Sequence, residues 1–268
     1  MDPIAILQAF LLGLLEGLTE FLPVSSTGHL ILASELMGFT GDGSVAFKIA
    51  IQLGAILAVL VAYRQRFAHI AAGLVRRDSG AIAFTRNILL GFLPAMVVGF
   101  FAYSSIRQLI ESPMTVAIAL IVGGIAILLI EKLVPPRIEG QVETMPWRTA
   151  LGVGVVQCIA MVPGVSRSGA TIMGGLLMGL DRKTAAEFSF FLAVPTMAAA
   201  TVYSLYKERH LLDADDLGLI AIGFVTAFVS ALMVVRWLVG FVGRHGFAPF
   251  AWYRIALGSI ALVWLLLR

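Results

Sequence analysis

Charged side chains are scarce in this sequence, and their scarcity decides its class. Asp, Glu, Lys and Arg make up 13% of the 268 residues, about half of the roughly 25% found in soluble globular domains. Hydrophobic residues make up 59%. A water-soluble core could not hide so many apolar side chains, and a disordered chain would be far more polar. The composition excludes an ordinary cytosolic enzyme and predicts an integral membrane protein.

Several signals of other protein classes are missing as well. Cys158 is the only cysteine, so no disulfide can form within the chain. No His/Cys grouping has the spacing of a zinc site, and no Gly-Lys-Ser/Thr of a Walker phosphate loop occurs. Residues 1–15 lack the basic segment of a cleavable signal peptide. No feature predicts nucleic-acid binding, and membrane lipids are the expected surroundings.

Six segments have the length and apolarity of membrane spans, which need about 20 mostly apolar residues. The segments are 45–63, 88–104, 114–131, 185–205, 217–236 and 250–267. Continuous apolar runs without alternation predict helices and argue against a transmembrane barrel. We expect one all-α membrane domain over residues 1–268.

Two further apolar regions, 4–38 and 149–180, are interrupted in the middle. The interruptions read EGLTEFLPVSSTGH (16–29) and QCIAMVPGVSRSGAT (157–171). Irregular backbone at membrane depth is tolerated only where protein or a watery cavity satisfies its polar groups. We therefore predict two re-entrant helical hairpins, each entering and leaving on one side.

The distribution of basic residues predicts the orientation, because cytoplasmic loops are enriched in Lys and Arg. With 64–87 as a cytoplasmic loop, both termini and the first hairpin open to the outside, and the second hairpin opens to the cytoplasm. The cytoplasmic side then holds Arg64, Arg66, Arg76, Arg77, Arg86, Lys132, Arg137, Arg148, Arg182, Lys183, Arg236 and Arg244; the other side holds Arg107, Lys207, Arg209 and Arg268.

The two interrupted regions resemble each other at a constant offset of 141 residues. The matches cluster at the unusual positions: Val24-Ser25 with Val165-Ser166, Gly28 with Gly169, and Leu36-Met37-Gly38 with Leu177-Met178-Gly179. Each repeat is one hairpin plus three spans, about 1–131 and 149–268. Because three is odd, the second repeat is inverted, as in membrane proteins whose sites lie between inverted repeats. Chance similarity between two glycine-rich apolar runs is the alternative.

The first hairpin carries two carboxylates at helical spacing. Glu16 and Glu20 are four residues apart, hence on one face of a helix. Carboxylates inside a membrane are costly unless paired or hydrated. They predict a metal-binding or acid–base pair, unless they lie solvated at the mouth of the hairpin.

Each interruption also contains a serine-rich turn that opens a helix, where N–H groups and the helix dipole favour an anion. PVSSTGH (23–29) offers the hydroxyls of Ser25, Ser26 and Thr27 and the imidazole of His29. PGVSRSGAT (163–171) offers Arg167, whose planar guanidinium suits phosphate, flanked by Ser166, Ser168 and Gly169. The serines could instead serve only as helix caps.

Other polar residues give weaker signals. Gln52, Lys48 and Glu187 could line a cavity or tie helices together. Arg254 in the last span is expected to pair with a carboxylate or to extend toward the membrane surface. Small residues in GLLMG (175–179) and VGG (122–124) would permit a homodimer through close helix contacts.

The two motifs, EGLTEFLPVSSTGH (16–29) and PGVSRSGAT (163–171), resemble the signatures of the bacterial undecaprenyl-diphosphate phosphatases, also called the bacitracin resistance protein family. The resemblance extends over nearly the whole chain, including EFSFFLAVP (187–195). It implies a plasma-membrane hydrolase that recycles the lipid carrier of peptidoglycan synthesis and confers bacitracin resistance. It also implies a site facing the periplasm and a divalent cation, Mg²⁺ or Ca²⁺. The functional residues that it carries over are Glu16, Glu20, Ser26, His29 and Arg167.

The residues fit such chemistry but leave alternatives open. Glu16 and Glu20 are the predicted metal ligands. Ser25, Thr27, Ser166, Ser168, Gly169 and Gln52 are the predicted substrate-binding residues. Ser26 is the expected nucleophile, with Glu20 or His29 taking its proton; direct attack by water or a phosphohistidine at His29 are the rivals. A lipid-phosphate flippase or anion transporter is the alternative function, since inverted repeats are typical of transporters. A structural scaffold is the weakest alternative.

Overall fold

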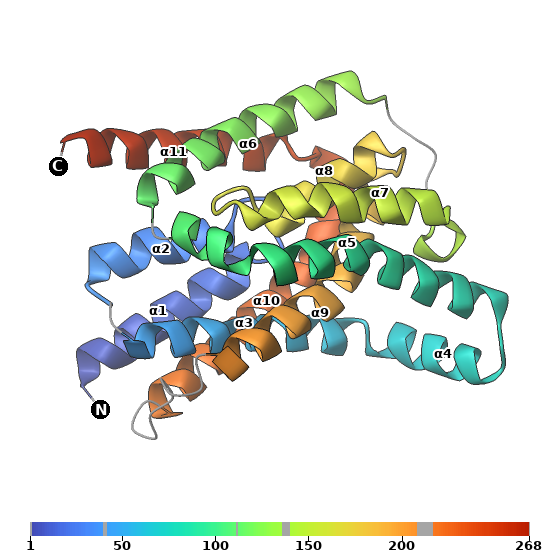
Figure 1. Cartoon of the computed structure of the whole chain (residues 1–268), viewed down its shortest axis with the longest axis horizontal. Helices are drawn as coiled ribbons and strands as arrows, with labels where there is room; N and C mark the ends of the chain where they lie inside the picture. Colours follow the sequence, from blue (N-terminus) through green and yellow to red (C-terminus); the bar gives the residue numbers. More distant parts are fainter. Residues whose placement is uncertain (1, 40–41, 111, 136–139, 208–216, 268) are drawn as a thin grey trace.

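The computed structural model is all-helical throughout the part of the chain that it describes, which is residues 2–39, 42–110, 112–135, 140–207 and 217–267. Figure 1 shows the helices packed side by side, with the N-terminal end of α1 and the C-terminal end of α11 at the same end of the molecule. The elements are α1 (Pro3–Thr19), α2 (Ser26–Met37), α3 (Asp42–Ala62), α4 (Arg64–Val75), α5 (Ser79–Ile110), α6 (Pro113–Leu133), η1 (Val142–Thr144), α7 (Trp147–Gln157), η2 (Cys158–Met161), α8 (Arg167–Leu177), α9 (Arg182–Lys207), α10 (Leu217–His245) and α11 (Ala248–Leu267).

Within the described residues, five helices are long and apolar enough to cross a membrane. They are α5, α6, α9, α10 and α11, and a sixth candidate is the pair α3 and α4, which is bent by 71° at Tyr63. The predicted spans all fall within these helices, so a multi-pass helical membrane protein is confirmed. The expectation of a loop over 64–87 was wrong, because α4 and the start of α5 fill most of it.

The two interrupted regions form pairs of short helices, as predicted. In the first, α1 continues to Thr19, Pro23 falls in the turn, and α2 begins at Ser26. In the second, α7 and η2 end at Met161 and α8 begins at Arg167. Figure 1 shows the α1–α2 pair and the α7–α8 pair extending from opposite ends of the molecule, with their turns directed toward its middle.

Glycines set how closely each hairpin packs on a long helix. A Cβ added at Gly13 of α1 would lie 2.9 Å from the Cα of Gly223 in α10, and one added at Gly154 of α7 would lie 2.9 Å from the Cα of Gly91 in α5. Both approaches exclude any side chain. Gly13 and Gly154 are separated by the same 141 residues that relate the two motifs.

Arg66, a basic residue of the predicted cytoplasmic side, meets acidic partners where α4, η1 and α9 come together. Arg66 lies 2.6 Å from Glu143 and 3.2 Å from Glu187, so Glu187 ties helices together. Asp181 caps α9: burial raises its pKa, but hydrogen bonds from Thr184, Gly140 and Lys183 outweigh burial and hold the pKa below its usual value. Of the basic residues assigned to the two sides, Arg137, Arg209, Arg268 and the side chain of Arg107 lie outside the described residues.

The glycines that suggested a homodimer are used inside the chain. An added Cβ at Gly124 would meet the Ala251 carbonyl oxygen at 2.7 Å, and one at Gly175 would meet Ala185 Cβ at 3.0 Å. These contacts lie within one copy of the chain, and the homodimer stays a prediction.

Candidate active site

The two hairpin turns have the same local structure, which fixes the start of α2 and of α8. Ser25 and Ser166 both have positive φ, 72° and 78°, a region that non-glycine residues rarely adopt. The hydroxyl of each accepts a hydrogen bond from the amide three residues on, at Gly28 and Gly169 respectively. Both serines therefore cap their helices, and the Gly169 amide is engaged by its own cap. Ser25 and Ser166 also line the cavity described below, so their role in substrate binding stays a prediction.

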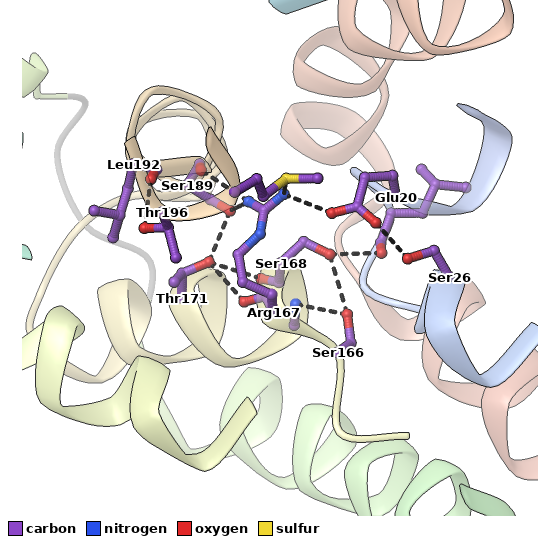
Figure 2. Close-up of polar contacts among 12 residues, drawn as sticks. Glu20, Ser26, Ser166, Arg167, Ser168, Thr171, Ser189, Leu192 and Thr196 are labelled. Atoms are coloured by element: carbon purple, nitrogen blue, oxygen red, sulfur yellow. Dashed lines mark hydrogen bonds and ion pairs between the residues drawn. The ribbon is translucent and has the colours of Figure 1, made fainter. Parts of the chain in front are cut away.

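Glu20 connects the two hairpins at the centre of the site (Figure 2). One carboxylate oxygen accepts a hydrogen bond from the Ser26 hydroxyl. The other accepts one from an Arg167 terminal nitrogen at 3.0 Å. All three residues were predicted from the sequence, and all three meet although Glu20 and Arg167 are 147 residues apart. A hydroxyl, a carboxylate and a guanidinium therefore lie together in a mostly buried site.

Arg167 is held in place by residues that were not predicted to belong to the site. One terminal nitrogen donates to the backbone oxygen of Ser189 in α9 at 3.0 Å, and the other lies 3.2 Å from the sulfur of Met197. The Ser189 hydroxyl is 2.7 Å from that of Thr171, within the hydrogen-bonded chain drawn in Figure 2. The Nε of Arg167 is buried and has no hydrogen-bond partner among the described residues. The segment 187–195 contributes Ser189 to the site.

Glu16 lies one helical turn before Glu20 and is fully buried. Neither of its carboxylate oxygens has a hydrogen-bond partner in the part of the chain that the structure describes. Within the same residues, no three His, Cys, Asp or Glu side chains gather into a metal-binding group. The expectation that Glu16 could lie solvated at the mouth of the hairpin is wrong, and its unpaired oxygens are its distinguishing feature.

His29 is hydrogen-bonded away from Ser26 and Glu20. Its Nδ1 lies 2.7 Å from the Ser25 carbonyl oxygen and its Nε2 lies 2.7 Å from the hydroxyl of Tyr253 in α11. Because a carbonyl only accepts, Nδ1 carries the proton, and the Nε2 of the neutral ring accepts from Tyr253. Of the two candidates for the Ser26 proton, only Glu20 is in hydrogen-bond contact with the hydroxyl.

The remaining predicted site residues line or support a polar cavity of about 240 Å³. We call this the polar cavity; both hairpin turns contribute to it, together with α3 and α9. Thr27, which is exposed, and Gln52 line it beside Ser26 and Arg167. Ser168 does not line it, because its hydroxyl donates to the Leu22 carbonyl at 2.7 Å and joins the two hairpins.

Arg254 performs a role that the sequence did not predict. It is buried in α11, and its guanidinium faces backbone carbonyl oxygens rather than a carboxylate, so both expectations for it were wrong. A guanidinium has five N–H donors, and each has an acceptor here. The five acceptors are the carbonyl oxygens of Pro23, Gly164, Val165, Ala119 and Leu120, at 2.9 to 3.3 Å. Arg254 thus fastens both hairpin turns to α6 and α11.

Comparison with known proteins gives consistent matches over nearly all of the chain. The model of a family described as bacitracin resistance protein BacA matches residues 9–260. A protein of Sphingopyxis alaskensis named undecaprenyl-diphosphatase is 69% identical over 95% of this chain and 96% of its own length. One of Rhizorhabdus wittichii with the same name is 60% identical over 98% of this chain and 99% of its own length. An undecaprenyl-diphosphatase 2 of Paramagnetospirillum magneticum is 57% identical over 98% of this chain.

Proposed function

The chain belongs to the bacitracin resistance protein BacA family, and from this premise we propose that it hydrolyses undecaprenyl diphosphate to undecaprenyl phosphate and inorganic phosphate. The observation that carries the proposal is the Glu20 carboxylate, which accepts hydrogen bonds from Ser26 and from Arg167. This arrangement joins a nucleophile, a base and a phosphate-binding cation within one cavity. Recycling of the lipid carrier for peptidoglycan synthesis, and resistance to bacitracin, would follow from this activity.

The chain's own residues account for each chemical step. Ser26 Oγ attacks the terminal phosphorus while its proton passes to Glu20. The bond from phosphorus to the bridging oxygen breaks, and undecaprenyl phosphate leaves with that oxygen. Arg167 holds the oxygens of the transferred group, so charge is stabilised where it develops. Water then attacks the phosphorus of the phosphoserine, and the bond from phosphorus to Ser26 Oγ breaks as Glu20 returns its proton to Oγ. The two protons of the attacking water leave with the inorganic phosphate.

Glu16 and Glu20 would hold a divalent cation. A buried carboxylate without a partner is costly unless a cation or a proton neutralises it, and both oxygens of Glu16 lack one among the described residues. Carboxylate oxygens are the ligands that Mg²⁺ and Ca²⁺ prefer. When bound, the cation would neutralise charge on the diphosphate. Among the described residues no third carboxylate, histidine or cysteine joins these two.

Cation binding can be measured without turnover. We expect Mg²⁺ to raise the Tm of the detergent-solubilised protein by a few degrees, because a ligand that binds only the folded state stabilises it. Glu16→Gln should abolish this rise. Glu35→Gln, the same substitution at an exposed position of α2, should retain it. A full rise in Glu16→Gln would exclude Glu16 as a ligand.

We further propose that the protein is a single domain of two inverted repeats, 1–131 and 149–268, with six spans and two re-entrant hairpins. The matching serine turns support this arrangement, as do the Gly13–Gly223 and Gly154–Gly91 contacts. The protein would lie in the bacterial inner membrane, with the basic end of α4 in the cytoplasm and the polar cavity reached from the periplasm. Transport of the lipid product is the second candidate, favoured by hairpins that extend from opposite ends.

Phosphate release in detergent separates the two functions, because a solubilised protein has no sides between which to transport. We expect purified protein to release phosphate from undecaprenyl diphosphate, and a chelator to stop the release. Adding Mg²⁺ or Ca²⁺ in excess should restore it. If monodisperse protein at its normal Tm releases no phosphate with either cation, the hydrolase proposal fails and the transport proposal takes its place.

A further inference from the structure

A second cavity, largely apolar, lies beside the polar cavity. This apolar groove has a volume of about 410 Å³ and runs between α5 and α9, with η2 and the end of α7 along one wall. Small residues make room for it, among them Ala95 and Gly99 of α5 and Ala199 of α9. Phe92, Phe100 and Tyr203 supply aromatic walls.

The apolar groove and the polar cavity adjoin and share lining residues. Both are lined by Arg167, Met161, Ala160, Thr196 and Ala200. In Figure 2 Arg167 lies between Thr196 and Ser189 on one side and Glu20 and Ser26 on the other. Its terminal nitrogens bind Glu20 and Ser189, whereas its buried Nε has no partner among the described residues. The Arg167 guanidinium therefore lies at the boundary between the polar cavity and the apolar groove.

The far part of the groove opens toward the surroundings of the helices. Ala199 and Phe100, which line the groove and not the polar cavity, are exposed, and both flanking segments, Ser79–Phe101 and Arg182–Ser204, are candidate membrane spans. An apolar chain lying in the groove could therefore continue into the lipid. A volume of about 410 Å³ accommodates only the start of a long chain.

We propose that the apolar groove binds the isoprenoid units next to the diphosphate of the substrate, so that Ala95, Gly99 and Ala199 determine which lipid tails are accepted. This proposal rests on the proposed function and adds where the tail lies. An anionic head joined to an apolar tail is the ligand that matches a cavity lined by an arginine and serine hydroxyls beside an apolar groove. Binding of the tail beside Arg167 orients the terminal phosphorus toward Ser26, because the bridge between head and tail must pass the guanidinium.

The test fills the groove and leaves the polar cavity intact. Ala199→Phe adds an aromatic ring within the groove, and Gly99→Leu fills it from α5, where an added Cβ would meet only Met161 Cε at 3.6 Å. Val202→Phe is the matched control, since Val202 is exposed on the same helix and does not line the groove. The probes are farnesyl diphosphate, which has a head and a tail, and inorganic phosphate as a competing head without a tail.

We expect each groove variant to raise the KM for farnesyl diphosphate at least roughly tenfold, the scale on which apolar pockets discriminate a few carbon atoms. The inhibition constant of inorganic phosphate should stay within about twofold of wild type, and Val202→Phe should change neither value. An unchanged KM in both groove variants, or an equal rise in the inhibition constant, would overturn the tail site. If wild-type protein releases no phosphate, the proposed function fails. The tail site is then decided by thermal-shift binding of farnesyl diphosphate, which Ala199→Phe must weaken.

Discussion

Glu20→Gln is expected to lower kcat for prenyl diphosphate hydrolysis by about 10²–10⁴-fold, the usual contribution of a positioned general base. Glu20 accepts hydrogen bonds from two donors, the Ser26 hydroxyl and the Arg167 guanidinium. A glutamine has one acceptor oxygen, so its NH₂ group must face one of these donors. It also cannot take a proton from Ser26. Steady-state phosphate release at saturating substrate measures the loss.

The same experiment identifies the nucleophile when Ser26→Ala and the double variant are added. Residues that act as one unit show non-additive losses, so the double variant should be no slower than the slower single variant. Rapid quenching with substrate labelled at the terminal phosphate should trap label on wild-type protein and none on Ser26→Ala. Label at His29, or substantial turnover by Ser26→Ala, would contradict the assignment.

Glu35→Gln provides the matched control for Glu20→Gln. It makes the same chemical change on the first hairpin, but at an exposed position of α2 outside the polar cavity. Its kcat should stay close to that of wild type. If Glu20→Gln retained more than about a third of wild-type kcat, a loss too small for a general base, Glu20 would only position Ser26 and Arg167.

The sequence was most informative where the physics is local. Apolar length predicts the long helices, and the Pro- and Ser-rich interruptions predict the hairpin turns, because both follow from a dozen or so neighbouring residues. The offset of 141 residues also places Ser26 and Arg167 at matching positions of two turns. A site assembled from both hairpins could therefore be expected from the sequence, and the contacts of Glu20 with Ser26 and Arg167 agree with it.

Contacts between distant segments could not be read in the same way. His29 and Tyr253 are 224 residues apart, and nothing local to either residue indicates the other. Ser189 lies in a mostly apolar segment, and a single serine there does not indicate a contact with Arg167. The segment 64–75 was expected to be a loop because of its arginines, and it forms helix α4. Its Arg66 pairs with Glu143 and Glu187, which are far away in the sequence.

The partners of Arg254 could not be predicted from the sequence. An arginine in an apolar span suggests an acidic partner. Backbone carbonyl oxygens at irregular turns can also accept its hydrogen bonds, and residue type does not indicate which carbonyl oxygens are free. The carbonyl oxygens of Pro23, Gly164 and Val165 accept hydrogen bonds from Arg254 at 2.9 to 3.0 Å. No other donor reaches these three oxygens among the described residues. The cation therefore satisfies the backbone where two non-helical turns meet inside the protein.

Arg254→Met is accordingly expected to destabilise the protein severely. Each buried carbonyl left without a donor costs roughly 1–3 kcal/mol, and three of them together consume a large part of a typical stability of about 5–15 kcal/mol. The variant should accumulate poorly or unfold at a much lower Tm. Arg254→Lys keeps the charge but has three donors instead of five, so it should fold with an intermediate Tm and reduced kcat. Thermal unfolding in detergent and phosphate release measure both effects.

Two further variants separate the guanidinium contacts from charge alone. An added Cβ at Gly123 would lie 2.7 Å from Arg254 Cζ, so Gly123→Ala should displace the guanidinium and lower Tm and kcat without removing any charge. Arg244→Met removes an exposed arginine whose Nε donates to the Gly240 carbonyl oxygen of its own helix, and should leave both values near those of wild type. If Arg254→Met and Gly123→Ala also kept wild-type Tm and kcat, the hairpin turns would be held together without Arg254. Its carbonyl contacts would then be a consequence of the fold and not its cause.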